Sequence, residues 1–177
     1  MEATREIPGY DAVVVGGGPA GATAAHELAR DRRRVLLIDR PGRIKPCGGA
    51  IPPRLIRDFD IPDELIVARA NCARIVAPSA REVDMPIEGG YVGMVDRDVF
   101  DEWLRERARM AGAERADGRF DRVEYLRDGD GALVHYRDAE TGEARTIRAR
   151  LVVGADGANS KVAKQCVPRS DEGRFVA

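Results

Sequence analysis

The stretch YDAVVVGGGPAGATAAHELARDRRRVLLIDR, residues 10–40, decides the fold of this chain. It opens with the β-branched run Val13–Val15, which is typical of a strand buried inside a parallel sheet. Glycines follow at once, then a segment with helical spacing, and the apolar run VLLID forms a second buried strand. We therefore predict a β-α-β unit with a right-handed crossover. The helical spacing is carried by Ala20, Ala24 and Leu28.

The glycines form the pattern Gly16-x-Gly18-x-x-Gly21 between the first strand and the helix. Gly16 permits the tight turn, Gly18 lets a pyrophosphate approach the backbone, and Gly21 allows close helix–strand packing. The phosphates would then sit at the helix N-terminus. Asp39, at the end of the second strand, is placed to accept hydrogen bonds from an adenosine ribose. This combination predicts a dinucleotide site built from Gly16, Gly18, Pro19, Ala20, Gly21, Asp39 and Arg40.

The middle of the chain begins with a loop rich in proline and glycine, KPCGGAIPPR, residues 45–54. A short helical stretch around Leu55 to Phe59 follows, and the runs ARIVAP and REVDMPI could pair as strands. Asp96 is the predicted N-cap of a longer helix that ends near Gly112. One face of that helix carries Phe100, Trp103, Leu104, Ala108 and Ala111.

Three strand-like runs come after this helix: FDRVEYL, ALVHYRD and RTIRARLVVGAD. The sequences between them, RDGDG and AETGEA, are good turns, so we predict an antiparallel meander. The last run becomes wholly apolar at residues 151–153, as if it rejoined the buried sheet. The predicted fold class is α/β, with a Rossmann-like β-α-β core, a parallel sheet and an antiparallel β-meander.

Composition excludes several classes of protein. The 177 residues are 44% hydrophobic, and 29 basic against 30 acidic residues give no reason to expect nucleic acid as a partner. No apolar run approaches the roughly 20 residues that a membrane span needs, and the acidic N-terminus does not resemble a signal peptide. The expected location is the cytoplasm. Neither metal-ligand spacing nor a partner pattern is found for Cys47, Cys72, Cys166, His26 and His135, and both histidines are predicted at the surface.

Two further segments resemble FAD-dependent proteins of the p-hydroxybenzoate hydroxylase type. The segment LVVGADGANSKV resembles their second fingerprint, which in this chain contains Asp156 and Gly157. The segment VDRDVFDEWL is similar to the part of that superfamily whose arginine, Arg97 here, reaches the flavin. The resemblance implies that FAD is the dinucleotide and that these three residues contribute to its site.

A narrower resemblance is to the geranylgeranyl reductases of chlorophyll and bacteriochlorophyll synthesis. It covers residues 10–165, and RIKPCGGAIPP is its most distinctive part. The resemblance implies reduction of the C=C bonds of a geranylgeranyl chain to phytyl, with NADPH as reductant of the FAD. The implied substrate is geranylgeranyl diphosphate or a pigment ester, and an archaeal-type lipid stays open as an alternative. Such a substrate would bring the protein to the periphery of photosynthetic membranes.

The same resemblance places the CGG loop next to the flavin. Gly48 and Gly49 would permit that approach because they present only backbone. Cys47 is then the candidate catalytic residue, either packing the isoprenoid or assisting proton delivery. The alternative is a buried cysteine that acts as a small hydrophobe.

The chain departs from related flavoproteins after the second fingerprint. Their third motif, a Gly-Asp pair, and their substrate domain are absent from this sequence. We therefore expect residues 1–177 to be the N-terminal, FAD-binding portion of a longer reductase and to be inactive alone. Two alternatives stay open: an aromatic-ring flavin monooxygenase, and an FAD-binding module without turnover.

Overall fold

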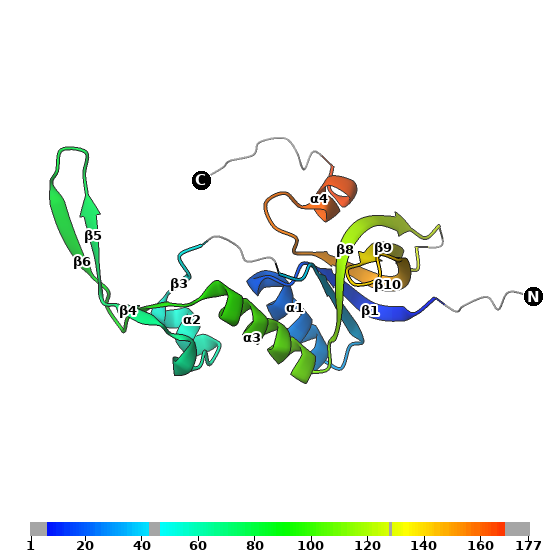
Figure 1. Cartoon of the computed structure of the whole chain (residues 1–177), viewed down its shortest axis with the longest axis horizontal. Helices are drawn as coiled ribbons and strands as arrows, with labels where there is room; N and C mark the ends of the chain where they lie inside the picture. The colour runs from blue at the N-terminus through cyan, green and yellow to red at the C-terminus, as the bar shows by residue number, and fades with distance from the viewer. Residues whose placement is uncertain (1–6, 43–46, 128, 169–177) are drawn as a thin grey trace, which may run out of the picture. The chain divides into compact units, whose positions relative to one another are not determined.

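The computed structural model describes residues 7–42, 47–127 and 129–168 (Figure 1). It divides the chain into two compact units. The discontinuous unit comprises residues 1–43 and 103–177, and the inserted unit comprises residues 44–102. The division falls within one helix, between Glu102 and Trp103.

The discontinuous unit is built on five strands whose hydrogen-bonded neighbours form a closed ring, in the order β1-β10-β9-β8-β2. β1 runs parallel to both β2 and β10. β9 runs antiparallel to both β8 and β10. The parallel sheet and the meander that the sequence predicts are therefore both present. The strands are β1 (Gly9–Val15), β2 (Val35–Asp39), β8 (Glu114–Tyr125), β9 (Ala132–Asp138) and β10 (Ala144–Gly154).

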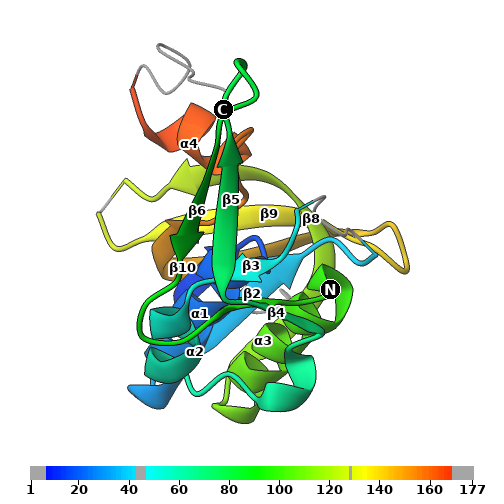
Figure 2. The ribbon, with the colours of Figure 1, turned by 90° about the vertical axis from the view of Figure 1, so that its left-hand side faces the viewer.

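Two of these strands, β8 and β10, pair with β9 and also with a strand of the parallel sheet; Figure 2 labels both of them. The start of β8, residues 114–117, pairs in parallel with β2, and the rest of β8 pairs with β9. β10 pairs with β9 along its first half and with β1 along its second half. The sequence did not predict the start of β8, because ERAD is charged and has neither the alternation nor the β-branched residues typical of a strand.

The core confirms why the two apolar runs fold as parallel strands. Val13, Val14, Leu37 and Ile38 are all at most 1% exposed, so β1 and β2 are covered on both faces. One face packs against the meander through Phe120, Val134, Ile147 and Ala149. Helix α1 packs against β1 and β2.

Helix α1 (Pro19–Arg30) has a different buried face from the one that its apolar spacing suggests. Ala20 is exposed, and Ala24 and Leu28 are only half-buried. Alanines occur on both the expected and the observed buried faces of this helix, so composition alone does not fix its rotation. The close approach of Gly21 to the strands fixes it instead. The buried residues are Gly21, Ala22, Ala25, His26 and Ala29. The prediction that His26 is a surface residue is therefore wrong.

The longer helix, α3 (Arg97–Met110), starts directly after Asp96, as predicted. Phe100, Leu104 and Ala108 are buried, whereas Trp103 and Ala111 are half-buried. A short helix, α4 (Lys161–Cys166), follows the second fingerprint and is capped by the Ser160 hydroxyl, which accepts from the Ala163 amide at 2.8 Å. Within the described ranges, no helix is both long and apolar enough to cross a membrane.

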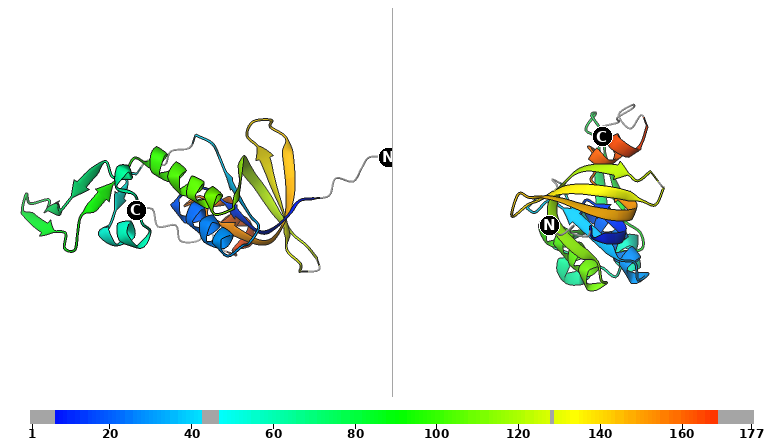
Figure 3. Two further views of the ribbon diagram at one scale, coloured as in Figure 1. Left: turned by 90° about the horizontal axis from the view of Figure 1, so that it is seen from below. Right: turned by 90° about the vertical axis from the view of Figure 1, so that its right-hand side faces the viewer.

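The inserted unit contains a small antiparallel sheet in the order β3-β7-β4 and a separate hairpin, β5–β6. The predicted pairing of the runs ARIVAP and REVDMPI is confirmed by this hairpin. Every residue of β5 and β6 is exposed, and the hairpin extends away from the small sheet (Figure 3). The elements are β3 (Ala50–Ile51), α2 (Pro53–Asp58), the 3-10 turn η1 (Asp63–Leu65), β4 (Ala68–Ala70), β5 (Cys72–Val76), β6 (Glu82–Pro86) and β7 (Val92–Met94).

We expect Tyr10 on β1 to titrate at unusually high pH. Burial, together with the hydrogen bond that its hydroxyl donates to Glu114 at 2.8 Å, raises the pKa of Tyr10 from 10.0 to about 12. The folded-state pKa lies above the unfolded value, so the protonated Tyr10 hydroxyl contributes to the stability of the fold. This contribution is complete below pH 10 and is lost as pH rises through 12. Tyr10→Phe should therefore flatten the alkaline loss of stability. The titration of Tyr10 is obtained by subtracting the phenolate absorbance of Tyr10→Phe from that of the wild type at each pH. A midpoint of this difference at the ordinary tyrosine pKa would contradict the prediction.

Candidate functional site

The carboxyl ends of β2, β1 and β10 meet at one edge of the parallel sheet. The Gly16 amide donates to the carbonyl of Ile38 at 2.8 Å, and the Ala155 amide donates to the carbonyl of Val15 at 2.8 Å. The glycine loop, Asp39 and the second fingerprint are thus brought together in the discontinuous unit. In α/β proteins with parallel strands, ligands bind outside the carboxyl ends of those strands.

The structure gives physical reasons for two of the predicted glycines. Gly16 has φ +103°, a conformation that side chains rarely adopt, and a Cβ there would collide with the Ala155 backbone. A Cβ at Gly21 would collide with the carbonyl oxygen of Gly16. Gly21 therefore sets how closely α1 approaches the end of β1.

Gly18 differs from these two, because a Cβ there would meet no atom within 4 Å. It is the N-cap of α1, and no side chain caps that helix. Pro19 occupies the start of the helix, Ala20 is exposed, and no acidic residue lies in the first turn. The helix start therefore leaves backbone amides and open space for an anionic group, which fits the phosphates of a dinucleotide.

Asp39 lies at the end of β2 against the same loop. A Cβ at Gly17 would come within 2.7 Å of its Oδ2 atom, so the glycine between Gly16 and Gly18 is also required. Arg105 on α3 donates from Nη1 to the Gly17 carbonyl at 3.1 Å and lies 3.4 Å from Asp39 Oδ2. Arg40, the next residue after Asp39, is exposed.

The second fingerprint, residues 151–162, is held in place by hydrogen bonds to the carboxylate of one of its own residues. Asp156 accepts hydrogen bonds from the Ser160 hydroxyl and from the Lys161 amide at 2.6 Å, so it caps the start of α4. Gly157 follows with φ +87°. Gly154 lies so close to Val162 that a Cβ there would approach the valine side chain to 2.9 Å. The segment therefore holds α4 tightly against the end of β10, and a contact of Asp156 and Gly157 with FAD stays a prediction.

The remaining predicted residues, Cys47, Gly48, Gly49 and Arg97, all lie in the inserted unit. Gly49 has φ +68°, and a Cβ there would collide with the carbonyl of Val95. The Val95 amide also donates to the Gly49 carbonyl at 3.0 Å. Gly48 is exposed, and a Cβ there would lie 3.9 Å from Met94 as its nearest contact. The fold of the unit thus requires Gly49 but not Gly48.

Arg97 is fixed by a partner that the sequence analysis missed. Its Nε and Nη2 atoms donate to the two carboxylate oxygens of Asp101 at 2.9 and 2.8 Å. Both side chains are nearly buried, with 11% and 7% exposed. The Asp101 carboxylate, and with it the Cys47 thiol, raises the pKa of Arg97. Cys47 itself is exposed in this chain, and its role stays a prediction.

The structure therefore brings the predicted residues together in two groups, one in each unit. Sequence reasoning missed Gly17, Asp101 and Arg105. Asp101 had a detectable signal, since an acid four residues after an arginine on a helix favours an ion pair. Arg105 had none, because Gly17 and Asp39, which it contacts, are far away in the chain.

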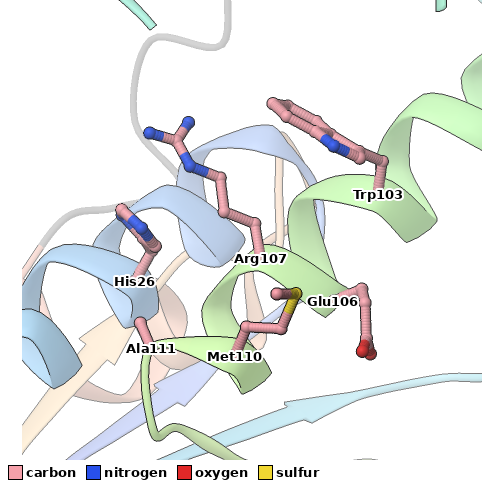
Figure 4. Close-up of a pocket in the computed structure, with 6 residues that line it drawn as sticks. All are labelled: His26, Trp103, Glu106, Arg107, Met110 and Ala111. Atoms are coloured by element: carbon pink, nitrogen blue, oxygen red, sulfur yellow. The ribbon is translucent and has the colours of Figure 1, made fainter. Parts of the chain in front are cut away.

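A hollow between α1 and the second half of α3 contains none of the predicted site residues (Figure 4). Its volume is about 350 Å³, and the Arg107 guanidinium lies over the Trp103 ring at 5.5 Å. His26 points into it from α1. The lining residues are His26, Trp103, Glu106, Arg107, Met110 and Ala111.

A family model described as an FAD binding domain matches residues 56–174, which is more than half of the chain. The chain belongs to this FAD-binding domain family. A second model, described as an NAD(P)-binding Rossmann-like domain, matches residues 14–56, the part that contains the glycine loop and Asp39. The predictions of an α/β Rossmann-like fold and of an FAD cofactor are thereby confirmed.

Relatives of this FAD-binding domain include two geranylgeranyl diphosphate reductases. The protein from Rhodobacter capsulatus is 62% identical over 153 residues, which are 86% of this chain and 39% of the relative. The chloroplastic protein from Oryza sativa is 43% identical over an alignment of 165 positions, and the match covers 85% of this chain and 35% of the relative. The chain thus spans little more than a third of the length of these reductases.

A solved structure agrees with these relatives. A geranylgeranyl bacteriochlorophyll reductase-like protein from Thermoplasma acidophilum matches with a TM-score of 0.83 and 30% identity. The match covers 97% of this chain and 44% of that protein. The resemblance to geranylgeranyl reductases is therefore confirmed in both sequence and fold.

Proposed function

We propose that this chain is the FAD-binding part of a reductase that hydrogenates the C=C bonds of a geranylgeranyl chain, with NADPH as donor. The observation that carries the proposal is the edge of the parallel sheet where the glycine loop, Asp39 and the second fingerprint meet. The identity to geranylgeranyl diphosphate reductases supports the choice of substrate.

The discontinuous unit would hold the ADP half of FAD. The uncapped start of α1, from Gly18 to Gly21, offers amides to the pyrophosphate. The Asp39 carboxylate offers an acceptor to the ribose hydroxyls. Gly18 has no atom near its missing side chain, so a phosphate could approach its backbone directly.

The inserted unit would act at the alkene. Bound FAD, once reduced by NADPH, supplies hydride chemistry. An isolated alkene has no electron-withdrawing neighbour, so the protein must orient it tightly and deliver a proton to one carbon. Cys47 is the residue proposed for that step, because its thiol is exposed and lies next to a fixed guanidinium, Arg97. The lipid character of the substrate favours a peripheral association with membranes.

A chimera tests this function. The matching region of the Rhodobacter capsulatus reductase is replaced by this chain, and the products formed from geranylgeranyl diphosphate with NADPH are followed by mass spectrometry. We expect stepwise hydrogenation by the chimera and none by the 177-residue chain alone. A chimera that folds and loads FAD, yet consumes oxygen with NADPH and hydrogenates nothing, would reject the proposal.

Substitutions in the CGG loop of the chimera should separate ligand approach from folding. We expect Gly48→Val to lower flavin content at unchanged stability, because this side chain would enter open space where the flavin is proposed to approach. Gly49→Val should destabilise the fold directly, through its positive φ and the Val95 carbonyl. Cys47→Ser should retain FAD and release more partially reduced product. If Gly48→Val and Cys47→Ser both have the flavin content and product profile of the wild type, the loop has no role at the flavin and only links its neighbours.

A further inference from the structure

Arg105 joins the two parts of the candidate dinucleotide site from a third element. Its guanidinium donates to the carbonyl of Gly17 at 3.1 Å and lies 3.4 Å from Asp39 Oδ2. The three residues are far apart in the sequence but all lie in the discontinuous unit. The side chains of Arg105 and Asp39 are 18% and 27% exposed, so this ion pair is more sheltered than a typical surface pair.

The position of Asp39 depends on what holds its carboxylate. Gly17 has no side chain, and the carboxylate lies against its backbone so closely that even a Cβ would not fit. Arg105 binds the carbonyl of that same residue and the Oδ2 oxygen. One guanidinium thus holds the Gly17 carbonyl and the Asp39 Oδ2 atom next to each other.

Charge gives Arg105 a second effect at this edge. A dinucleotide bound here would place an anionic pyrophosphate at the glycine loop, close to the Asp39 carboxylate. The negative charges of the pyrophosphate and the carboxylate would repel each other. A partly buried cation beside the carboxylate offsets that repulsion. A positively charged, planar side chain with several donors is suited to holding a carboxylate and a carbonyl together.

We infer that Arg105 is a positioning residue for the ADP half of the cofactor: it holds the Asp39 carboxylate in the orientation that accepts the ribose hydroxyls. The inference rests on the proposed function, because it assumes that a dinucleotide occupies this edge. It assigns Arg105 no contact with the ligand. Its effect on binding must therefore pass through Asp39.

A double-mutant cycle tests that coupling. ADP is titrated into the 177-residue chain, and the amide resonances of the glycine loop report the dissociation constant even when binding is weak. We expect Arg105→Ala to weaken ADP binding about tenfold, but less than about twofold when it is combined with Asp39→Asn. The matched control is Arg109→Ala, one turn further along α3, whose partner is Glu106 on the exposed surface. It should leave ADP binding unchanged.

Two further arms separate positioning from simple folding. 2′,3′-Dideoxy-ADP lacks the ribose hydroxyls, so Arg105→Ala should weaken its binding clearly less than it weakens ADP binding, and Arg105→Lys should restore part of the ADP affinity. If Arg105→Ala does not fold, Arg105→Gln replaces it in the cycle. An equal loss of affinity in the wild-type and Asp39→Asn backgrounds, or an equal loss for both ligands, would overturn the inference. A wild-type chain that binds neither ADP nor FAD would overturn the proposed function with it, whereas wild-type binding that Arg105→Ala leaves unchanged overturns the inference alone.

Discussion

Gly21→Ala is expected to lower the free energy of unfolding by about 3 kcal/mol or more and to abolish nucleotide binding. The added Cβ would overlap the carbonyl oxygen of Gly16, and it would also approach the Ala155 side chain to 3.1 Å. Both neighbours belong to the junction of β1 and β10, where backbone atoms have little room to yield. Helix α1 would have to move away from the sheet. Chemical denaturation and ADP titration measure the two effects.

Gly18→Ala is the matched control for this substitution. It adds the same methyl group three residues earlier, where no atom lies within 4 Å and φ is −72°. We expect an unchanged free energy of unfolding but weaker ADP binding, since the methyl group would occupy the space proposed for the pyrophosphate. A similar loss of stability in both variants would show that close packing at Gly21 is not the cause.

The second large effect is expected for Asp101→Ala. Asp101 is 5% exposed and holds both Nε and Nη2 of Arg97. Its removal would leave a nearly buried guanidinium without its carboxylate, which typically costs about 3 kcal/mol or more. We expect that loss in thermal or chemical unfolding of the chain.

An exposed pair of the same type gives the comparison. Arg54 and Asp58 also lie four residues apart on a helix, but their side chains are 82% and 41% exposed. Solvent screens such a pair, so Asp58→Ala should change stability only slightly. Equal effects of Asp58→Ala and Asp101→Ala would mean that burial of the Arg97–Asp101 pair contributes nothing.

The order of the elements could be predicted where residues close together in the sequence determine it. The β-α-β unit follows from Val13–Val15, the glycines and VLLID, and the meander follows from its two turn sequences. The start of β8 could not be predicted, because its charged residues become a strand only through pairing with β2. Likewise, the buried position of His26 depends on how α1 is rotated against the sheet, and the sequence does not record that rotation.

The candidate site shows the same limit. Gly16 and Gly21 could be recognised because their roles depend on a turn and a packing distance within one motif. Gly17 fell at a variable position of the motif and is required only because Asp39 lies against it. Arg105 looks like any arginine on the polar side of a helix until α3 is placed beside the loop. Tertiary contacts of this kind leave no periodic or spacing signal.

The pairing of β1 with β10 also limits the order in which the chain can fold. Val15 pairs with Gly154, so the parallel sheet cannot be completed until nearly the whole described chain has emerged from the ribosome. The inserted unit has strand pairings between segments that are close in the sequence. In the sequence, its residues 44–102 come between the two segments of the other unit. Local pairings form faster than pairings between distant segments, because closing a long loop costs more conformational entropy. During synthesis, therefore, Gly16 and Asp39 leave the ribosome before Ala155 does, and this edge of the parallel sheet is complete only when the last strand, β10, pairs with β1.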